Sequence, residues 1–225
     1  MFLYPPSTRF GKAVPKTRIF AAVSASKRIK ELFSAHVAEI AWAHKLSPET
    51  LHLPARDGIT EIQVFTLLLK AAEIDQASLR SIVQTIDRAI PFPIFFECIH
   101  EDRIRHVVSY KRPSEADAAK WVIETTFDHG WQAAPERLPL PVALDLAALY
   151  DQCLRHHLPL PARPQESLRA HVTRLLTLEA KQRELVQLEA RLKREKQFNR
   201  KVELHGQLRS LTSEIASLAS DGDSC

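Results

Sequence analysis

Two acidic residues beside a predicted strand have the types and spacing that metal-assisted hydrolysis requires. Asp57 precedes residues 59–70 (ITEIQVFTLLLK), in which Glu61 and Gln63 lie two residues apart. Two carboxylates that converge at a strand end can hold Mg²⁺, and a nearby lysine can activate water. Gln63 stands where that lysine would be needed, so a polar pair on the exposed face of an edge strand is the simpler interpretation. A divergent metal-dependent nuclease using Asp57 and Glu61 is one hypothesis.

Histidines at two places invite a metal or catalytic interpretation. His156 and His157 are adjacent in the sequence, and neighbouring residues on a helix point in different directions. We therefore expect them to interact with the last carbonyls of a helix rather than to share an ion. His129, between Asp128 and Gly130, is expected to shape a turn rather than to form a catalytic dyad.

A basic segment, residues 191–201 (RLKREKQFNRK), contains a single acid, Glu195. Its cationic residues are Arg191, Lys193, Arg194, Lys196, Arg200 and Lys201. Such side chains bind phosphate groups whatever the base sequence, so the segment is a candidate nucleic-acid site. Phe198 could stack on a base, although its helical spacing from Leu188 and Val202 favours packing.

The basic segment lies within a stretch that is typical of long helix. Residues 165–219 contain no proline and one glycine, and they are rich in Leu, Glu, Lys, Arg and Gln. A continuous helix of this length would extend roughly 80 Å, which is longer than a small domain is wide. Such a helix must fold back on itself or find a partner.

Two leucine runs with heptad-like spacing flank the basic segment. The runs are Leu185, Leu188 and Leu192, and then Leu204, Leu208, Leu211, Ile215 and Leu218. They are out of phase, so either the seam shifts around one helix or the chain turns over into an antiparallel hairpin. We expect a protein partner, or a second copy of the chain, to bind Leu204, Leu208, Leu211 and Ile215.

Hydrophobic periodicity predicts the elements that precede this arm. We expect a helix over residues 27–45, a strand over 59–70, a helix over 76–89, a hairpin turning at Glu101–Asp102, a strand over 121–127 and a helix over 142–157. The order indicates an α+β fold, with a small mixed or antiparallel sheet of about four strands packed with helices, followed by a long coiled-coil-like arm. The predicted domains are an α+β domain over 1–135, a linking helix and proline-rich hinge over 136–164, and a helical arm or hairpin over 165–225.

Composition sets broad limits on function. The 225 residues carry a formal net charge of +4, which permits nucleic-acid contact without demanding it. Three widely spaced cysteines, Cys98, Cys153 and Cys225, indicate a reducing, cytoplasmic compartment. We find no membrane span, phosphate loop, Rossmann glycine fingerprint, nucleophile elbow or cysteine zinc site, and we expect no cofactor, metal or small-molecule substrate.

Four segments resemble, in order, the bacterial family called domain of unknown function 4391. They are residues 42–53 (WAHKLSPETLHL), 61–70 (EIQVFTLLLK), 86–96 (IDRAIPFPIFF) and 193–208 (KREKQFNRKVELHGQL). His52 and the pair His205-Gly206 depart from the asparagine-containing variants of those segments that we expect in the family. The resemblance supplies no catalytic residues. It implies a prokaryotic accessory protein of a kind often encoded near helicases and DNA methyltransferases in defence or restriction-like loci.

Three functions follow as hypotheses from these residues. The favoured one is a non-catalytic accessory or adaptor protein that docks on a partner through the helical arm, in a bacterial DNA-defence or restriction-like system. The alternative is nucleic-acid binding through the basic segment, and the third is the divergent nuclease.

Overall fold

A computed structural model describes residues 2–117, 120–133 and 136–220, so Cys225 and the last part of the predicted arm lie outside the described residues. The chain divides into two compact units, residues 1–157 and 158–225. The strands are β1 (Phe2–Leu3), β2 (Arg9–Ala13), β3 (Val37–Leu46), β4 (Ile62–Leu69), β5 (Ile94–His100), β6 (Arg103–Pro113), β7 (Trp121–Ala133) and β8 (Leu138–Pro139). The helices are the 3₁₀ helix η1 (Pro6–Thr8), α1 (Lys16–Ala22), α2 (Lys27–His36), α3 (Pro48–Leu51), α4 (Gln76–Ala89), α5 (Leu146–His156), α6 (Leu168–Arg194) and α7 (Phe198–Ala219).

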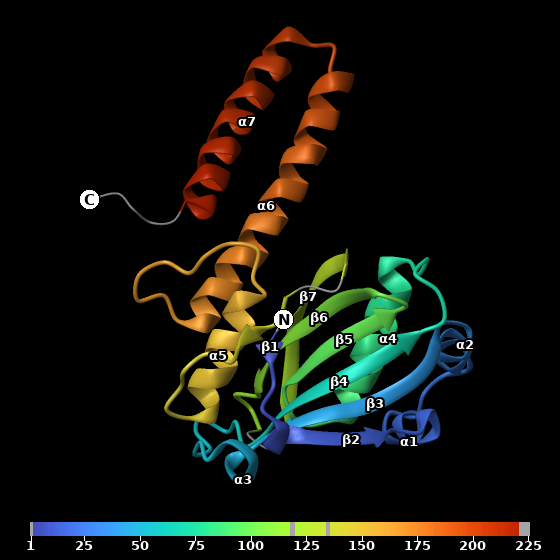
Figure 1. Ribbon diagram of the computed structural model, residues 1–225. Coiled ribbons are helices and arrows are strands. Elements are labelled where there is room, and N and C mark those ends of the chain that lie inside the picture. The colour runs from blue at the N-terminus through green and yellow to red at the C-terminus, as the bar shows by residue number, and fades with distance from the viewer. Residues whose placement is uncertain (1, 118–119, 134–135, 221–225) are drawn as a thin grey trace. The chain divides into compact units, whose positions relative to one another are not determined.

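Strands β2 to β7 of the first unit form one sheet in the order β2-β3-β4-β5-β6-β7 (Figure 1). β4 and β5 are parallel and are connected by α4, whereas the other neighbouring pairs are antiparallel. β1 and β8 form a separate two-stranded parallel sheet. The predicted α+β fold is therefore confirmed, with six strands in the main sheet instead of four.

Helices cover both faces of this sheet. α4 begins where Asp75 caps the backbone N–H of Ser78 at 2.9 Å, and its apolar side packs on one face together with α1 and α2. Phe65 and Phe96 belong to that core. Because side chains alternate along a strand, Phe95 points to the opposite face, where it meets Tyr150 of α5.

The prediction of a helix over residues 27–45 is wrong beyond His36. α2 starts as expected, with the Ser26 hydroxyl accepting a hydrogen bond from the Ile29 N–H at 3.4 Å, but the chain then enters β3. Val37 and Ile40 have apolar spacing that suits either structure, and strand pairing decides between the two. β3 pairs with both β2 and β4, so its backbone groups are satisfied by neighbours that are distant in the sequence.

α5 belongs to the first compact unit, residues 1–157, whereas a linking helix was expected after residue 135. The Tyr150 hydroxyl accepts a hydrogen bond from the Lys111 N–H at 2.9 Å and lies 3.2 Å from the Ser109 carbonyl. These bonds attach α5 to β6.

The second unit contains a helical hairpin. The long helical stretch is interrupted at residues 195–197, between α6 and α7, and not at Gly206, which lies inside α7. Leu188, Leu204 and Leu211 are buried between the two helices. Of the two arrangements open from the sequence, the chain adopts the hairpin.

Candidate functional site

The basic segment forms the tip of the hairpin. Arg191, Lys193 and Arg194 occupy the last turn of α6. Lys196 lies in the connecting loop, and Arg200 and Lys201 lie in the first turn of α7. All six side chains are exposed. The turn between the helices thus gathers cations from two helix ends and one loop.

These cations have no acidic partners within the described residues, where none of them forms an ion pair. The neighbouring acid, Glu195, accepts hydrogen bonds from the backbone N–H groups of Lys196 and Gln197, both at 2.8 Å. Those backbone bonds are the main reason that the pKa of Glu195 is lowered, and the charges of Arg200 and Lys201 add a smaller effect. The positive charge of the tip therefore remains available to an external anion.

The helix dipole favours some of these positions and opposes others. Cations in the last turn of α6 stabilise that helix, because its C-terminus carries partial negative charge. Arg200 and Lys201 lie at the positive end of α7, which has no acidic residue in its first turn and no side-chain cap. Their placement lowers helix stability, so stability alone does not account for them.

Phe198, the first residue of α7, is 77% exposed. The expectation that it packs against other residues is wrong, since the hairpin turn moves it outside the leucine seam. An exposed aromatic ring among unpaired cations can stack on a nucleic-acid base.

The leucines predicted to bind a partner lie in the seam of the hairpin. Leu204 and Leu211 are buried there, and Leu208 and Ile215 pack against the same cluster. Much of their apolar surface is therefore used within the chain. Binding of a partner at these four residues stays a prediction, and a partner would have to open the hairpin to reach the two buried leucines.

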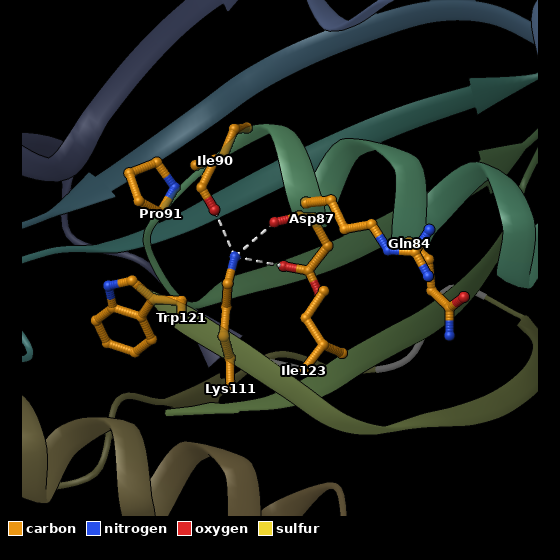
Figure 2. A pocket seen from close by; sticks show the side chains of 8 residues that line it. Gln84, Asp87, Ile90, Pro91, Lys111, Trp121 and Ile123 are labelled. Carbon is orange, nitrogen blue, oxygen red and sulfur yellow. Dashed lines mark hydrogen bonds and ion pairs between the residues drawn. The ribbon is translucent and has the colours of Figure 1, made fainter. Parts of the chain in front are cut away.

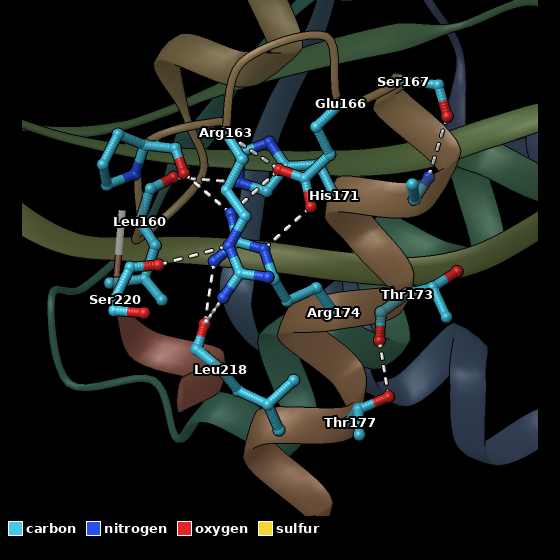
Figure 3. Close-up of polar contacts among 12 residues, drawn as sticks. Leu160, Arg163, Glu166, Ser167, His171, Thr173, Arg174, Thr177, Leu218 and Ser220 are labelled. Atoms are coloured by element: carbon cyan, nitrogen blue, oxygen red, sulfur yellow. Dashed lines mark hydrogen bonds and ion pairs between the residues drawn. The ribbon is translucent and has the colours of Figure 1, made fainter. Parts of the chain in front are cut away.

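The end of the hairpin opposite its tip is held by arginines that bind the last carbonyls of α7 (Figure 3). Arg174 donates to the Leu218 carbonyl at 3.0 Å and forms two hydrogen bonds with Glu166, at 2.8 and 2.9 Å. Arg163 donates to the carbonyls of Ser217 and Ser220. Hydrogen bonding from Arg174 is the main reason that the pKa of Glu166 falls to about 2. These arginines are saturated by the chain itself, in contrast to those at the tip.

The two candidate nuclease carboxylates have different surroundings. Asp57 lies in a turn with φ of +51°, is 78% exposed at its side chain and pairs with Arg56 at 3.8 Å. Glu61 is buried and pairs with Lys45 of β3 at 3.2 Å. The Gln63 amide nitrogen also donates to Glu61. Among the described residues no group of three or more His, Cys, Asp or Glu side chains is arranged to hold a metal ion.

Lys45 is a residue that the sequence reasoning missed. The register of β3 and β4 places it opposite Gln63, so the neighbouring strand supplies the lysine that β4 lacks at this position. Recognising residues 37–46 as a strand would have made Lys45 a candidate neighbour of β4, although the register itself comes from the structure.

A second buried ion pair lies at the C-terminal end of α4, beside a pocket of about 300 Å³ (Figure 2). Lys111 and Asp87 are almost completely buried, with Nζ 3.0 Å from Asp87 Oδ1. The same ammonium group donates to the carbonyls of Asp87, Ile90 and Phe92. Lys111 therefore caps the end of α4, and its charge is fully used by that task.

Four histidines meet on the face of the sheet that carries α5. The ring of His157 lies 5.1 Å from His129, 5.7 Å from His106 and 5.4 Å from His156, measured between centroids. Burial is the main cause that lowers the pKa of His157 to about 2 and that of His106 to about 4, and neighbouring histidines lower both further. The cluster contains residues from β6, β7 and the end of α5. These residues are far apart in the sequence, so no local pattern predicts that they meet.

The family assignment comes from comparison with known proteins. A model described as Domain of unknown function (DUF4391) matches residues 2–215 of the 225. The chain belongs to this family. The match spans residues of both units and confirms the resemblance found in the sequence. No curated protein and no solved structure matches this DUF4391 protein. None of the described helices combines the length and apolar character of a membrane span.

Proposed function

We propose that this DUF4391 protein binds nucleic acid through the tip of its α6–α7 hairpin. The observation that supports this proposal most is the set of six exposed cations at the turn between α6 and α7, none paired with an acid among the described residues. Cations bound to partners inside the chain, such as Arg174, are satisfied by folding, whereas those at the tip are not. A polyanion supplies the missing charge.

Phe198 favours a strand with accessible bases as the ligand. Its ring is exposed beside Arg200 and Lys201 in the first turn of α7. Stacking on an aromatic ring contributes about 1–3 kcal/mol per base and requires an unpaired or splayed base. We therefore propose a preference for single strands over duplex of the same length.

The experiment is a titration of a fluorescent 20-nucleotide strand, and of its duplex, at several salt concentrations. If all six cations contact phosphates, the logarithm of the association constant should fall with the logarithm of salt at a slope of about −4 for the single strand. Changing Arg194, Lys196 and Arg200 to Gln should roughly halve that slope, because each lost phosphate contact reduces it by about 0.7.

A matched control removes three exposed cations elsewhere. Lys27, Arg28 and Lys30 on α2 are exposed, and changing them to Gln lowers net charge by the same amount. Binding that weakens equally in both triple variants, or a slope near zero for the unchanged protein, would contradict a site at the tip.

A second candidate function is protein docking as a non-catalytic accessory subunit in a DNA-handling defence or restriction-like complex. Its support is that Val186 on α6 and Val202 on α7 are 65% and 54% exposed, apart from the buried seam. Light scattering with co-expressed neighbouring gene products would test it. Association that survives Val186→Glu and Val202→Glu, with nucleic acid removed, would count against docking at these valines.

A further inference from the structure

A small apolar cavity of about 240 Å³ lies in the first unit, between the sheet and the helices on one of its faces. α1 contributes Arg18 and Ala22, and β3 and β4 contribute Trp42, Gln63 and Phe65. The segment after α4 completes the lining with Pro91 and Phe92. Aromatic side chains thus come from three separate parts of the chain.

One residue that lines this cavity has a buried polar atom without a partner. Gln63 is 3% exposed, and its Oε1 has no hydrogen-bond partner. The side chain lines a cavity whose other walls are mainly apolar. An unsatisfied buried acceptor lowers stability, so a ligand that donates a hydrogen bond here would recover free energy.

The orientation of the Gln63 amide is fixed by its neighbours. The Gln63 amide nitrogen donates to Glu61, whose carboxylate is also paired with Lys45 at 3.2 Å. An ionised carboxylate can only accept hydrogen bonds, so the amide nitrogen must face Glu61 and Oε1 must face away from it. The ion pair from β3 to β4 therefore fixes the amide of Gln63, which lines the cavity, with its oxygen left as an acceptor without a donor.

Arg18 adds a cation at the same cavity. Its residue is exposed on α1, and it forms no ion pair within the part of the chain that the structure describes. A guanidinium group can bind a phosphate through two parallel hydrogen bonds. The cavity thus combines aromatic walls, a fixed acceptor and an available cation.

We propose that this cavity binds the base of a nucleotide, with Gln63 Oε1 accepting a hydrogen bond from an N–H of the base and Arg18 contacting its phosphate. The flat heteroaromatic ring packs against Trp42, Phe65 and Phe92. This site is separate from the hairpin tip, and its existence does not depend on the function proposed for the tip.

The test is calorimetric titration of the full chain with AMP, GMP, CMP and UMP, with ribose 5-phosphate as the ligand that lacks a base. At least one nucleotide should bind, and ribose 5-phosphate should not. Gln63→Met should weaken binding of the nucleotide and its nucleoside about tenfold, the effect of losing one hydrogen bond of about 1.4 kcal/mol. Arg18→Ala should weaken the nucleotide and leave the nucleoside unchanged.

Controls separate this site from the tip and from misfolding. The variant with Gln at Arg194, Lys196 and Arg200 should bind the nucleotide as the unchanged protein does. If Gln63→Met fails to fold, Ala22→Phe fills the cavity from α1, leaves Gln63 in place and should also abolish binding. If a trinucleotide binds more tightly than the monophosphate, the ligand of the cavity is a base within a strand. If the two bind equally, the ligand is a free nucleotide. Absence of binding at millimolar nucleotide, or unchanged binding in folded Gln63→Met, overturns the proposal.

Discussion

Lowering the pH from 7.0 to 5.5 should destabilise the first unit, because its histidine cluster is buried in the neutral state. His157 and His106 are each 6% exposed, and the Nε2 atom of His106 has no hydrogen-bond partner. Their ring centroids are 5.7 Å apart, and His129 and His156 border the same group. A proton added to either buried ring would be poorly solvated and would face other histidines.

The magnitude follows from the difference in pKa between the unfolded and folded chains. An unfolded histidine has a pKa of about 6.5, whereas the pKa is about 2 for His157 and about 4 for His106 in the fold. Below pH 6.5 the unfolded chain therefore binds more protons than the folded chain does. As the pH is lowered, the free energy of unfolding decreases. At pH 5.5 each of these two histidines should reduce it by about 1.4 kcal/mol. The lowered pKa values of His129 and His156 act in the same direction.

Urea unfolding followed by tryptophan fluorescence measures this effect. The three tryptophans, Trp42, Trp121 and Trp131, all lie in the first unit, so the hairpin does not contribute to the signal. The free energy of unfolding should fall by roughly 3 kcal/mol between pH 7.0 and 5.5, before most carboxylates titrate.

His157→Gln should remove about half of this pH dependence. That result is expected whether or not the substitution changes the free energy of unfolding at pH 7.0. His205 is exposed on α7, and His205→Gln should change nothing. A pH effect below about 1 kcal/mol in the unchanged protein, or one that His157→Gln leaves intact, would refute the reasoning from burial.

Three further predictions concern packing, a buried ion pair and the tip. Leu211→Ala should cost the hairpin about 2–5 kcal/mol, seen as faster hydrogen exchange in α6 and α7, whereas Val202→Ala should have little effect. Lys111→Met should destabilise the first unit by about 3–5 kcal/mol in the urea assay, and a second change, Asp87→Leu, should restore much of the loss. Arg200→Glu should stabilise α7 by about 0.3–1 kcal/mol in the same exchange experiment while weakening nucleic-acid binding. A variant that lowers both the stability of α7 and nucleic-acid binding would contradict our explanation of where Arg200 lies.

Local patterns were sufficient to predict several elements of the first unit. The helix over 76–89 is confirmed by α4, because its amphipathic pattern could be recognised locally. The hairpin turning at Glu101–Asp102 is confirmed by β5 and β6. The error over residues 37–45 arose where local spacing was ambiguous and pairing with β2 and β4 decided the structure. Such pairing joins residues far apart in the chain and leaves no local signal.

The candidate sites also divide into features that a local sequence pattern indicates and features that depend on contacts between distant residues. The basic segment was visible as composition, and its position at a turn was one of two arrangements open from the leucine phases. The contact of Lys45 with Glu61 was not visible, because it depends on strand register. The histidine cluster likewise combines His106, His129 and His157, which only the sheet and α5 bring together.

Satisfied and unsatisfied polar groups carry different information about function. The ammonium group of Lys111 and the guanidinium group of Arg174 are surrounded by acceptors from their own unit, so the fold itself supplies their partners. Arg200 opposes the dipole of its own helix and has no acidic partner among the described residues, and Gln63 Oε1 is a buried acceptor without a donor. Each feature carries a local cost, because Arg200 opposes the dipole of its helix and Gln63 Oε1 is buried without a donor. A partner that supplies phosphate to one and an N–H donor to the other accounts for both costs, which is why ligands should be sought first at these two places.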